Sequence, residues 1–172
     1  MPFPIEQQEQ ALWCWAAVSD SADHYFDTAS TLKQCIVAKA VLGRDCCGNP
    51  PACNQAMKLQ DALSSIGRLA KPPSSGPPSF NKLKNELNAL RPVAVRIAWF
   101  GGGAHFVLIC GFKVLRSGVT KLEIADPFYG DVVNGTYFGI WEIDSNLFPQ
   151  AYQDGGNWDA TYFLQAKSGD NP

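Results

Sequence analysis

The sequence has no apolar run long enough to cross a membrane. A transmembrane helix needs about 18 consecutive apolar residues, and no stretch of the 172-residue chain reaches that length. The first residues, MPFPIEQQEQ, also lack the basic start and the apolar stretch of a signal peptide. We therefore expect no membrane partner.

Concentrated positive charge is missing as well. The chain has 14 Lys and Arg against 16 Asp and Glu, a formal net charge of -2, and its basic residues form no cluster. Because phosphate backbones bind to a concentrated basic face, we expect no nucleic-acid partner. Hydrophobic residues make up 46% of the chain and aromatic residues 12%, which indicates a folded globule. With no internal repeat, residues 1–172 are predicted to form a single domain.

Cysteine, in contrast, is frequent for a chain of this size. Four of the six cysteines fall within a short stretch: Cys35, Cys46, Cys47 and Cys53. A bridge between the adjacent Cys46 and Cys47 would be strained, so two disulfide pairings remain open. Reduced cysteines and a zinc site are the alternatives, but the stretch lacks the paired C-x2-C knuckles of zinc sites, and we expect no metal. Disulfides imply an oxidising compartment, so we expect the protein to be secreted or periplasmic, including as an exported effector.

Periodicity predicts helices in the first half of the chain. Trp15, Val18, Ala22 and Tyr25 recur at spacings of three and four, which predicts a helix that begins near Cys14. Three further helices are predicted: one capped by Thr28 or Ser30 and ended by Gly43, one capped by Asn54 and ended by Gly67, and a short one through Leu83, Leu87 and Leu90. The Pro-, Gly- and Ser-rich residues 71–79 are predicted to form a loop that links two lobes.

Strand-forming runs dominate the second half. Strands are predicted at residues 93–99, 105–112, 121–126 and 159–166, and Asn134-Gly135 predicts a two-residue hairpin between two more. Helices followed by antiparallel strands indicate an α+β fold. We expect a helical lobe over about residues 1–75 and a β-rich lobe over residues 76–172.

The stretch ALWCWAAVS, residues 11–19, sets Cys14 at the start of the first predicted helix. The unpaired N–H groups and the positive dipole end of a helix favour a thiolate there, although a free cysteine is more often a small buried hydrophobe. We expect Cys110, which lies in an apolar strand, to be such a buried free thiol.

A nucleophilic cysteine needs a base and an oxyanion donor. The chain has two histidines, and His24 lies ten residues along the same predicted helix, about 15 Å away and out of reach of Cys14. His105, where a glycine loop meets a strand, is therefore the predicted base. Gln8, six residues before Cys14, is the candidate oxyanion donor, with Gln7 and Gln10 as rivals.

The spacing of these residues resembles that of papain-like cysteine proteases. Gln8, five further residues and then Cys14-Trp15-Ala16 match the active-site segment of that family, and GGAHFVLICGF is similar to its histidine strand. The family order of glutamine, cysteine, histidine and Asn or Asp is supplied by Gln8, Cys14, His105 and Asp126. DPFYG departs from the Asn-Ser-Trp-Gly of the plant enzymes, which points to the bacterial branch with the AvrRpt2-type effector proteases and C39-like peptidases.

The resemblance implies a papain-like fold with the active site between the two lobes. It implies a peptidase in which Cys14 attacks the carbonyl, His105 transfers the proton, Asp126 orients His105, and Gln8 with the Cys14 N–H binds the oxyanion. Rival acceptors for His105 are Asp131, Asn134, Asp144 and Asn146.

Further expectations concern the substrate and the partners. We expect Trp13, Gly103 and Ala104 to contact a protein or peptide substrate, with Trp99, Phe100 and Trp141 as further candidates. We also expect the protein to be a monomer without a cofactor. A Cys-His acyl transferase or deamidase, and a catalytically silent binding module, are the alternative functions.

Overall fold

The computed structural model describes residues 3–129, 132–133, 136–137 and 140–171. Apart from the two-residue strand β1, which precedes the last helix, helices come first along the chain and strands follow, as the sequence predicts. The helices are α1 (Cys14–Phe26), α2 (Gln34–Leu42), the short 3-10 helix η1 (Pro50–Cys53), α3 (Leu59–Ser65) and α4 (Phe80–Asn88). The protein therefore has the predicted α+β character.

One antiparallel sheet dominates the second half of the chain. Its six strands run in the order β1-β8-β2-β3-β4-β7, and every neighbouring pair is antiparallel. Their bounds are β1 (Ser74–Ser75), β2 (Val93–Trp99), β3 (Ala104–Val114), β4 (Thr120–Ala125), β7 (Ile140–Asp144) and β8 (Gly156–Phe163). Two short strands, β5 (Val132–Val133) and β6 (Thr136–Tyr137), pair with each other. The predicted turn between them, Asn134-Gly135, lies outside the described residues.

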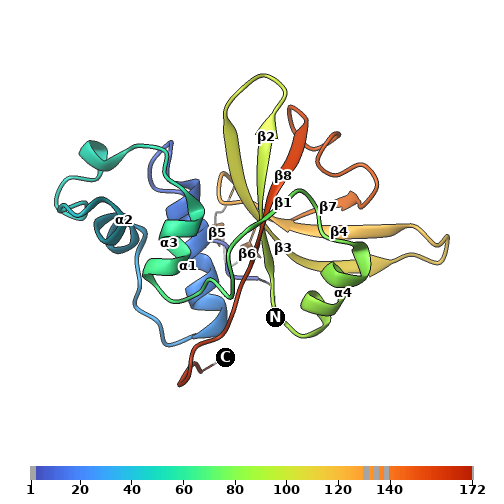
Figure 1. The fold of residues 1–172 in the computed structure, drawn as a ribbon, viewed down its shortest axis with the longest axis horizontal. Helices are drawn as coiled ribbons and strands as arrows, with labels where there is room; N and C mark the ends of the chain where they lie inside the picture. Colours follow the sequence, from blue (N-terminus) through green and yellow to red (C-terminus); the bar gives the residue numbers. More distant parts are fainter. Residues whose placement is uncertain (1–2, 130–131, 134–135, 138–139, 172) are drawn as a thin grey trace.

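The helices cover the sheet unequally. Helices α1, α2 and α3 gather on one side of the sheet in Figure 1, and α4 packs against β2 and β3. Side chains alternate along the strands, so Ala94, Phe106 and Leu108 enter the core shared with α1, while Val95 and Val107 enter the core shared with α4. The sheet thus separates two hydrophobic cores.

Helix α1 is the central helix of the larger core. Trp15, Val18 and Ala22 of the predicted stripe are fully buried, and small residues bury the remaining sides of the helix. The hydroxyls of Ser19 and Ser21 donate to carbonyl oxygens one turn earlier, at 2.8 and 2.7 Å, so these polar groups are satisfied in the core. A helix buried on most sides holds its first residue, Cys14, in a fixed position.

Two disulfides tie down the segment after α2. Cys35 pairs with Cys47 and Cys46 pairs with Cys53, which decides between the two pairings that the sequence leaves open. Such bonds are typical of proteins that mature in an oxidising environment. Within the described part of the chain, no helix has the length and apolar character needed to span a membrane.

Several predicted boundaries differ from the structure. Helices α2 and α3 begin after Lys33 and Lys58 without a side-chain cap, because the expected capping residues have other partners. Ser30 donates to the carboxylate of Asp23 at 2.6 Å, and Asn54 accepts from the N–H of Leu12 at 2.9 Å.

Three further predictions differ from the structure. The predicted linker, residues 71–79, contributes β1 to the sheet edge beside β8. The last strand begins at Gly156, three residues before the predicted start. Leu90, expected on the fourth helix, lies beyond its end and is exposed.

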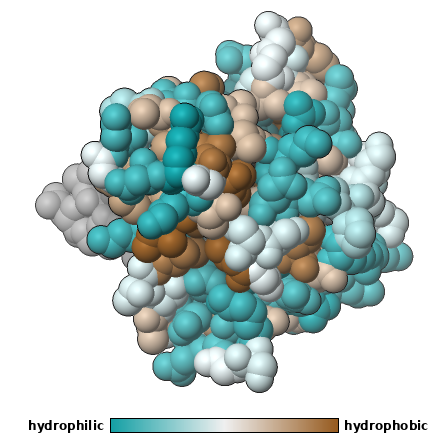
Figure 2. Space-filling model, turned by 60° about the vertical axis from the view of Figure 1, so that its left-hand side comes forward, coloured by the Kyte–Doolittle hydropathy of each residue, from teal (hydrophilic) through white to brown (hydrophobic). Residues whose placement is uncertain are grey.

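Turning the helical side forward shows where apolar residues reach the surface. In Figure 2 they gather near the middle of the visible face, and hydrophilic residues surround them.

Candidate active site

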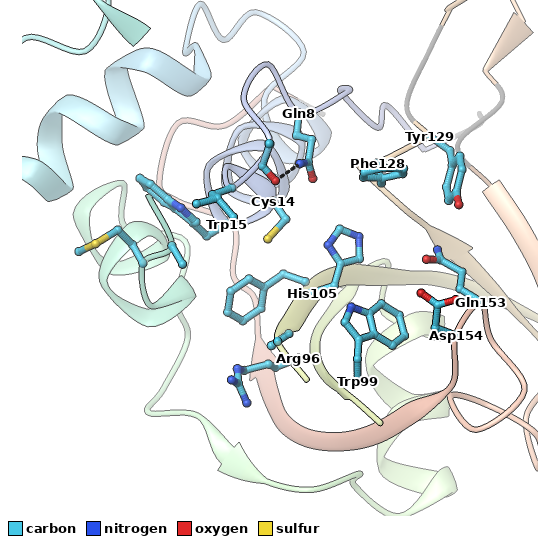
Figure 3. Close-up of a pocket in the computed structure, with 17 residues that line it drawn as sticks. Gln8, Cys14, Trp15, Arg96, Trp99, His105, Phe128, Tyr129, Gln153 and Asp154 are labelled. Atoms are coloured by element: carbon cyan, nitrogen blue, oxygen red, sulfur yellow. Dashed lines mark hydrogen bonds between the residues drawn. The ribbon is translucent and has the colours of Figure 1, made fainter. Parts of the chain in front are cut away.

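A pocket of about 650 Å³ lies beside the start of α1. Its lining comes from the N-terminal segment, α1, the residues before α3, β2, the start of β3, the turn after β4 and the segment between β7 and β8. Gln8, Cys14, Gly103, Ala104 and His105, all predicted site residues, line it together (Figure 3). Trp99 also lines it, whereas Phe100 and Trp141 do not.

Cys14 is the first residue of α1 and a free, partly exposed thiol. The first N–H groups of a helix have no partner within the helix, so they remain available to a negative charge. Its neighbours anchor this helix start: the indole of Trp13 donates to the carbonyl of Cys53 at 2.8 Å, and that of Trp15 to the carbonyl of Gln55 at 3.0 Å. The disulfide-linked segment therefore holds Cys14 in place.

The position of Trp13 corrects the expectation that it contacts substrate. Its side chain is fully buried in the helical core and is absent from the pocket lining. Trp15, on the other side of Cys14, reaches the pocket wall together with Met57 and Phe106. The indole N–H of Trp13 needs a buried acceptor, and the Cys53 carbonyl supplies it.

His105 lies near the start of β3, directly after a glycine turn. Gly102 and Gly103 take left-handed backbone conformations, φ +93° and +80°, and the N–H of Trp99 closes the turn on the carbonyl of Gly103. His105 is 8% exposed, and its imidazole faces Cys14 in Figure 3. The other histidine, His24, lies outside the pocket lining and 3.8 Å from Asp20.

Asp126 follows the end of β4 and meets His105 across the β3–β4 hairpin. The antiparallel pairing sets Ala125 opposite Leu108, so the end of β4 returns beside the start of β3. Nε2 of His105 donates to Oδ1 of Asp126 at 2.7 Å, which leaves Nδ1 for the Cys14 side. Of the rival acceptors, Asp144 pairs with Lys121, while Asp131 and Asn134 lie outside the described residues.

The electrostatics of this pair favour an imidazolium. Burial disfavours the charged ring, but its contacts with Asp126 and Cys14 more than offset burial and raise the pKa of His105 to about 9. Burial alone would raise the pKa of Asp126, yet the hydrogen bonds from His105, Tyr152 and the Phe128 N–H lower it. At neutral pH a buried carboxylate and a positively charged ring therefore lie together beside the Cys14 sulfur.

Gln8 shares the pocket, and its backbone N–H donates to the carbonyl of Pro127 at 2.8 Å, next to the Asp126 turn. Its amide nitrogen donates to the carbonyls of Ala11 at 2.8 Å and Gln10 at 3.1 Å. The amide oxygen is buried and has no partner among the described residues. The nitrogen of Gln8 thus has protein acceptors in this structure.

Two site residues have no counterpart in the sequence predictions. The hydroxyl of Tyr152 and the amide of Gln153 each donate to Oδ2 of Asp126 at 2.6 Å. They lie 26 and 27 residues after Asp126, in a segment without helical or strand periodicity. The Gly155-Gly156 pair indicates a turn there, and nothing in the sequence indicates where the side chains point.

The second free cysteine has a different environment. Cys110 lies in β3, and burial, with the charge of Glu123, raises its pKa to about 12. A thiol with such a pKa stays protonated and is a poor nucleophile. Among the described residues, no group of three or more His, Cys, Asp or Glu side chains could hold a metal ion.

A cysteine at a helix start beside a histidine–carboxylate pair is typical of thiol-dependent hydrolases and transferases. A family model described as papain-like cysteine protease AvrRpt2 matches residues 1–136, which include Gln8, Cys14, His105 and Asp126. The chain belongs to this family of papain-like cysteine proteases. None of the curated proteins compared with the chain matches it.

Proposed function

We propose that the protein is a cysteine peptidase that hydrolyses peptide bonds with Cys14, His105 and Asp126. The observation that carries this proposal is the site geometry. A free thiol at the start of α1 faces an imidazole, and that imidazole is bonded at 2.7 Å to a fully buried carboxylate. Family membership supports the same activity.

In the proposed reaction Cys14 acts as a thiolate paired with the His105 imidazolium. The sulfur attacks the substrate carbonyl, His105 gives its proton to the leaving amine, and a water molecule then hydrolyses the thioester with His105 as the base. Asp126 keeps the ring in the orientation and tautomer that turn Nδ1 toward Cys14.

The backbone N–H of Cys14 is the first proposed oxyanion donor, because it lies in the first turn of α1. Gln8 is the second. Its amide nitrogen has two protons, so one can stay on the carbonyl of Ala11 while the other leaves the longer contact with Gln10 for the oxyanion.

The substrate is proposed to lie between a helical and a β-rich lobe, as in a papain-like fold. The pocket takes residues from α1 and from β2 and β3, which supports this placement. Its aromatic and apolar lining, including Trp15, Met57, Trp99 and Phe106, suits a peptide with apolar side chains. The two disulfides support export to a periplasmic or extracellular location, and we propose that a monomer acts there.

Mass spectrometry of products from a diverse peptide library tests the function. We expect cleavage by the native protein and none by Cys14→Ala. Adding an amine nucleophile separates hydrolysis from acyl transfer, because a transferase would yield amide products at the expense of acids. Loss of ammonia from glutamine side chains, without backbone cleavage, would point to a deamidase. A native protein that leaves every peptide intact overturns the proposal.

A further inference from the structure

The carboxylate of Asp126 has two donors on each of its oxygens. Oδ1 accepts from Nε2 of His105 at 2.7 Å and from the N–H of Phe128 at 2.8 Å. Oδ2 accepts from the hydroxyl of Tyr152 and the amide of Gln153, both at 2.6 Å. One oxygen therefore serves the imidazole, and the other is held entirely by two consecutive residues of a distant segment.

A buried aspartate needs such donors more than a buried asparagine would. Asp126 is fully buried, and an ionised carboxylate away from water is unstable unless hydrogen bonds replace its hydration. His105 alone would satisfy only one of its oxygens. The donors on Oδ2 supply the remaining stabilisation of the charge.

The surroundings of Tyr152 keep its hydroxyl a hydrogen-bond donor to Asp126. Its side chain is 4% exposed and packs on Phe148, with ring centroids 5.6 Å apart, so the hydroxyl approaches Asp126 from the protein interior. Burial and the neighbouring carboxylate hold the pKa of Tyr152 well above its usual range. The hydroxyl therefore keeps its proton at neutral pH and donates to the carboxylate.

Gln153 reaches Asp126 from an unusual backbone conformation. Its φ is +50°, in the left-handed region that residues other than glycine seldom occupy. Such outliers gather at functional sites, where the surrounding structure holds them in place. Here the N–H of Tyr152 donates to the carbonyl of Pro149 at 3.1 Å, and the N–H of Gly155 to the carbonyl of Tyr152 at 2.9 Å. The turn directs two consecutive side chains to the same oxygen.

We propose that Tyr152 and Gln153 are positioning residues that keep Asp126 ionised and turn its Oδ1 toward His105. Their effect on catalysis rests on the proposed peptidase function, whereas their effect on Asp126 does not. Both residues lie beyond residues 1–136, the part of the chain that the family model matches.

The experiment compares Tyr152→Phe and Gln153→Met with the native protein. Gln150→Met is the matched control, because it makes the same change at an exposed residue of the same segment outside the pocket. Proton NMR follows the Nε2 proton of His105, which a carboxylate partner moves downfield, while the pH is lowered. His24 provides an internal reference. The acidic limb of kcat/KM is measured on the same proteins.

Protonation of Asp126 removes the downfield signal, and each lost donor makes that protonation easier. We expect the midpoint, the pH at which half of this signal is lost, to rise by about one unit or more in each variant. The reason is that a hydrogen bond to a charged group stabilises it by an energy equivalent to a pKa shift of about one unit or more. The acidic limb of kcat/KM should also move to higher pH in both variants, and kcat should fall more than KM changes. Gln150→Met should match the native protein.

An unchanged midpoint in Gln153→Met overturns the proposal, and this variant decides alone if Tyr152→Phe does not fold. A shifted midpoint in a protein that cleaves no peptide supports the positioning role and overturns only the proposed function. Equal loss of stability in both variants with no shift in midpoint would assign the two residues a merely structural role.

Discussion

The indole N–H of Trp13 donates to the carbonyl oxygen of Cys53 at 2.8 Å, which joins the residue before the candidate nucleophile to a disulfide. Both groups are buried, so neither can turn to water instead. The disulfide segment is therefore a support for the start of α1 as well as a cross-link.

Trp13→Phe tests this support. The change keeps an aromatic ring and leaves the Cys53 carbonyl without its donor, so we expect a loss of about 1–3 kcal/mol in the free energy of unfolding. A displaced helix start should also slow alkylation of Cys14. Urea denaturation and timed alkylation measure both, with Trp141→Phe, an exposed tryptophan, as the control. Equal stabilities of the two variants would contradict the supporting role.

The two disulfides should differ in their effect on the site. Removing either one should destabilise the protein by about 2–4 kcal/mol, as for short loops generally. The Cys46→Ser/Cys53→Ser variant should also lower kcat/KM more than Cys35→Ser/Cys47→Ser, because Cys53 bears the acceptor of Trp13. Activity assays on both double variants at a temperature where both are folded would decide this. Equal activities would show that the site does not depend on the Cys53 anchor.

Cys14 should be the most reactive thiol of the folded protein. The helix start and the His105 imidazolium favour its thiolate, whereas the pKa of Cys110 is raised to about 12. We expect iodoacetamide at mildly acidic pH to label Cys14 first and to abolish activity. Peptide mapping by mass spectrometry identifies the site, and earlier labelling of Cys110 would refute the assignment.

Asp126→Ala should lower turnover by about a hundredfold or more, because His105 loses its orienting partner. Asp126→Asn should be milder. Its amide oxygen can still accept from His105 and from the Phe128 N–H. The Tyr152 hydroxyl can rotate, and the Gln153 amide can turn its oxygen inward, to accept from the new amide. Steady-state kinetics with matched circular dichroism spectra test this order. Near-native turnover in Asp126→Ala would remove Asp126 from the proposed mechanism.

Asp126→Asn should also change the pH profile of kcat/KM. The pKa of His105 is raised from 6.5 to about 9, so its imidazolium persists until the pH rises through about 9. The raised pKa of His105 stabilises the folded protein fully below pH 6.5. This stabilisation is lost as the pH rises from 6.5 through about 9. Removing the charge in Asp126→Asn should move the basic limb of kcat/KM to lower pH. A basic limb that does not move would contradict the coupling of His105 to Asp126.

The candidate residues that the sequence predicted and the structure brings together lie at element boundaries. Cys14 begins a helix with a clear apolar stripe, and His105 follows a glycine turn at a strand start. Tyr152 and Gln153 could not be predicted, because their contact with Asp126 depends on how an irregular segment folds back over the sheet. Trp13 was misplaced because its position beside Cys14 does not indicate which side of the helix start faces the core.

Asp20 provides a pH-dependent test of the fold away from the site. It lies on α1, is 4% exposed, and its Oδ1 has no hydrogen-bond partner among the described residues. The groups around it are mostly acidic: Glu6 and Glu9 of the N-terminal segment and Asp23 of α1, with His24 3.8 Å away. Burial, followed by these negative charges, raises the pKa of Asp20 from 3.8 to about 8.

The sign of the effect follows from this shift. Below pH 3.8 Asp20 is protonated in both the folded and the unfolded chain, so its ionisation does not lower the stability of the folded protein. Between 3.8 and about 8 only the unfolded chain releases the proton, and this group costs up to about 1.4 kcal/mol per pH unit. Asp20→Asn stays neutral, so its free energy of unfolding should exceed that of the native protein by a few kcal/mol at pH 8 and by far less at pH 4. Urea denaturation at both values measures the difference, with Asp61→Asn at an exposed position as the control. A stability gain that is the same at pH 4 and pH 8 would mean that Asp20 is ionised in the folded protein and that its neighbours do not hold its proton.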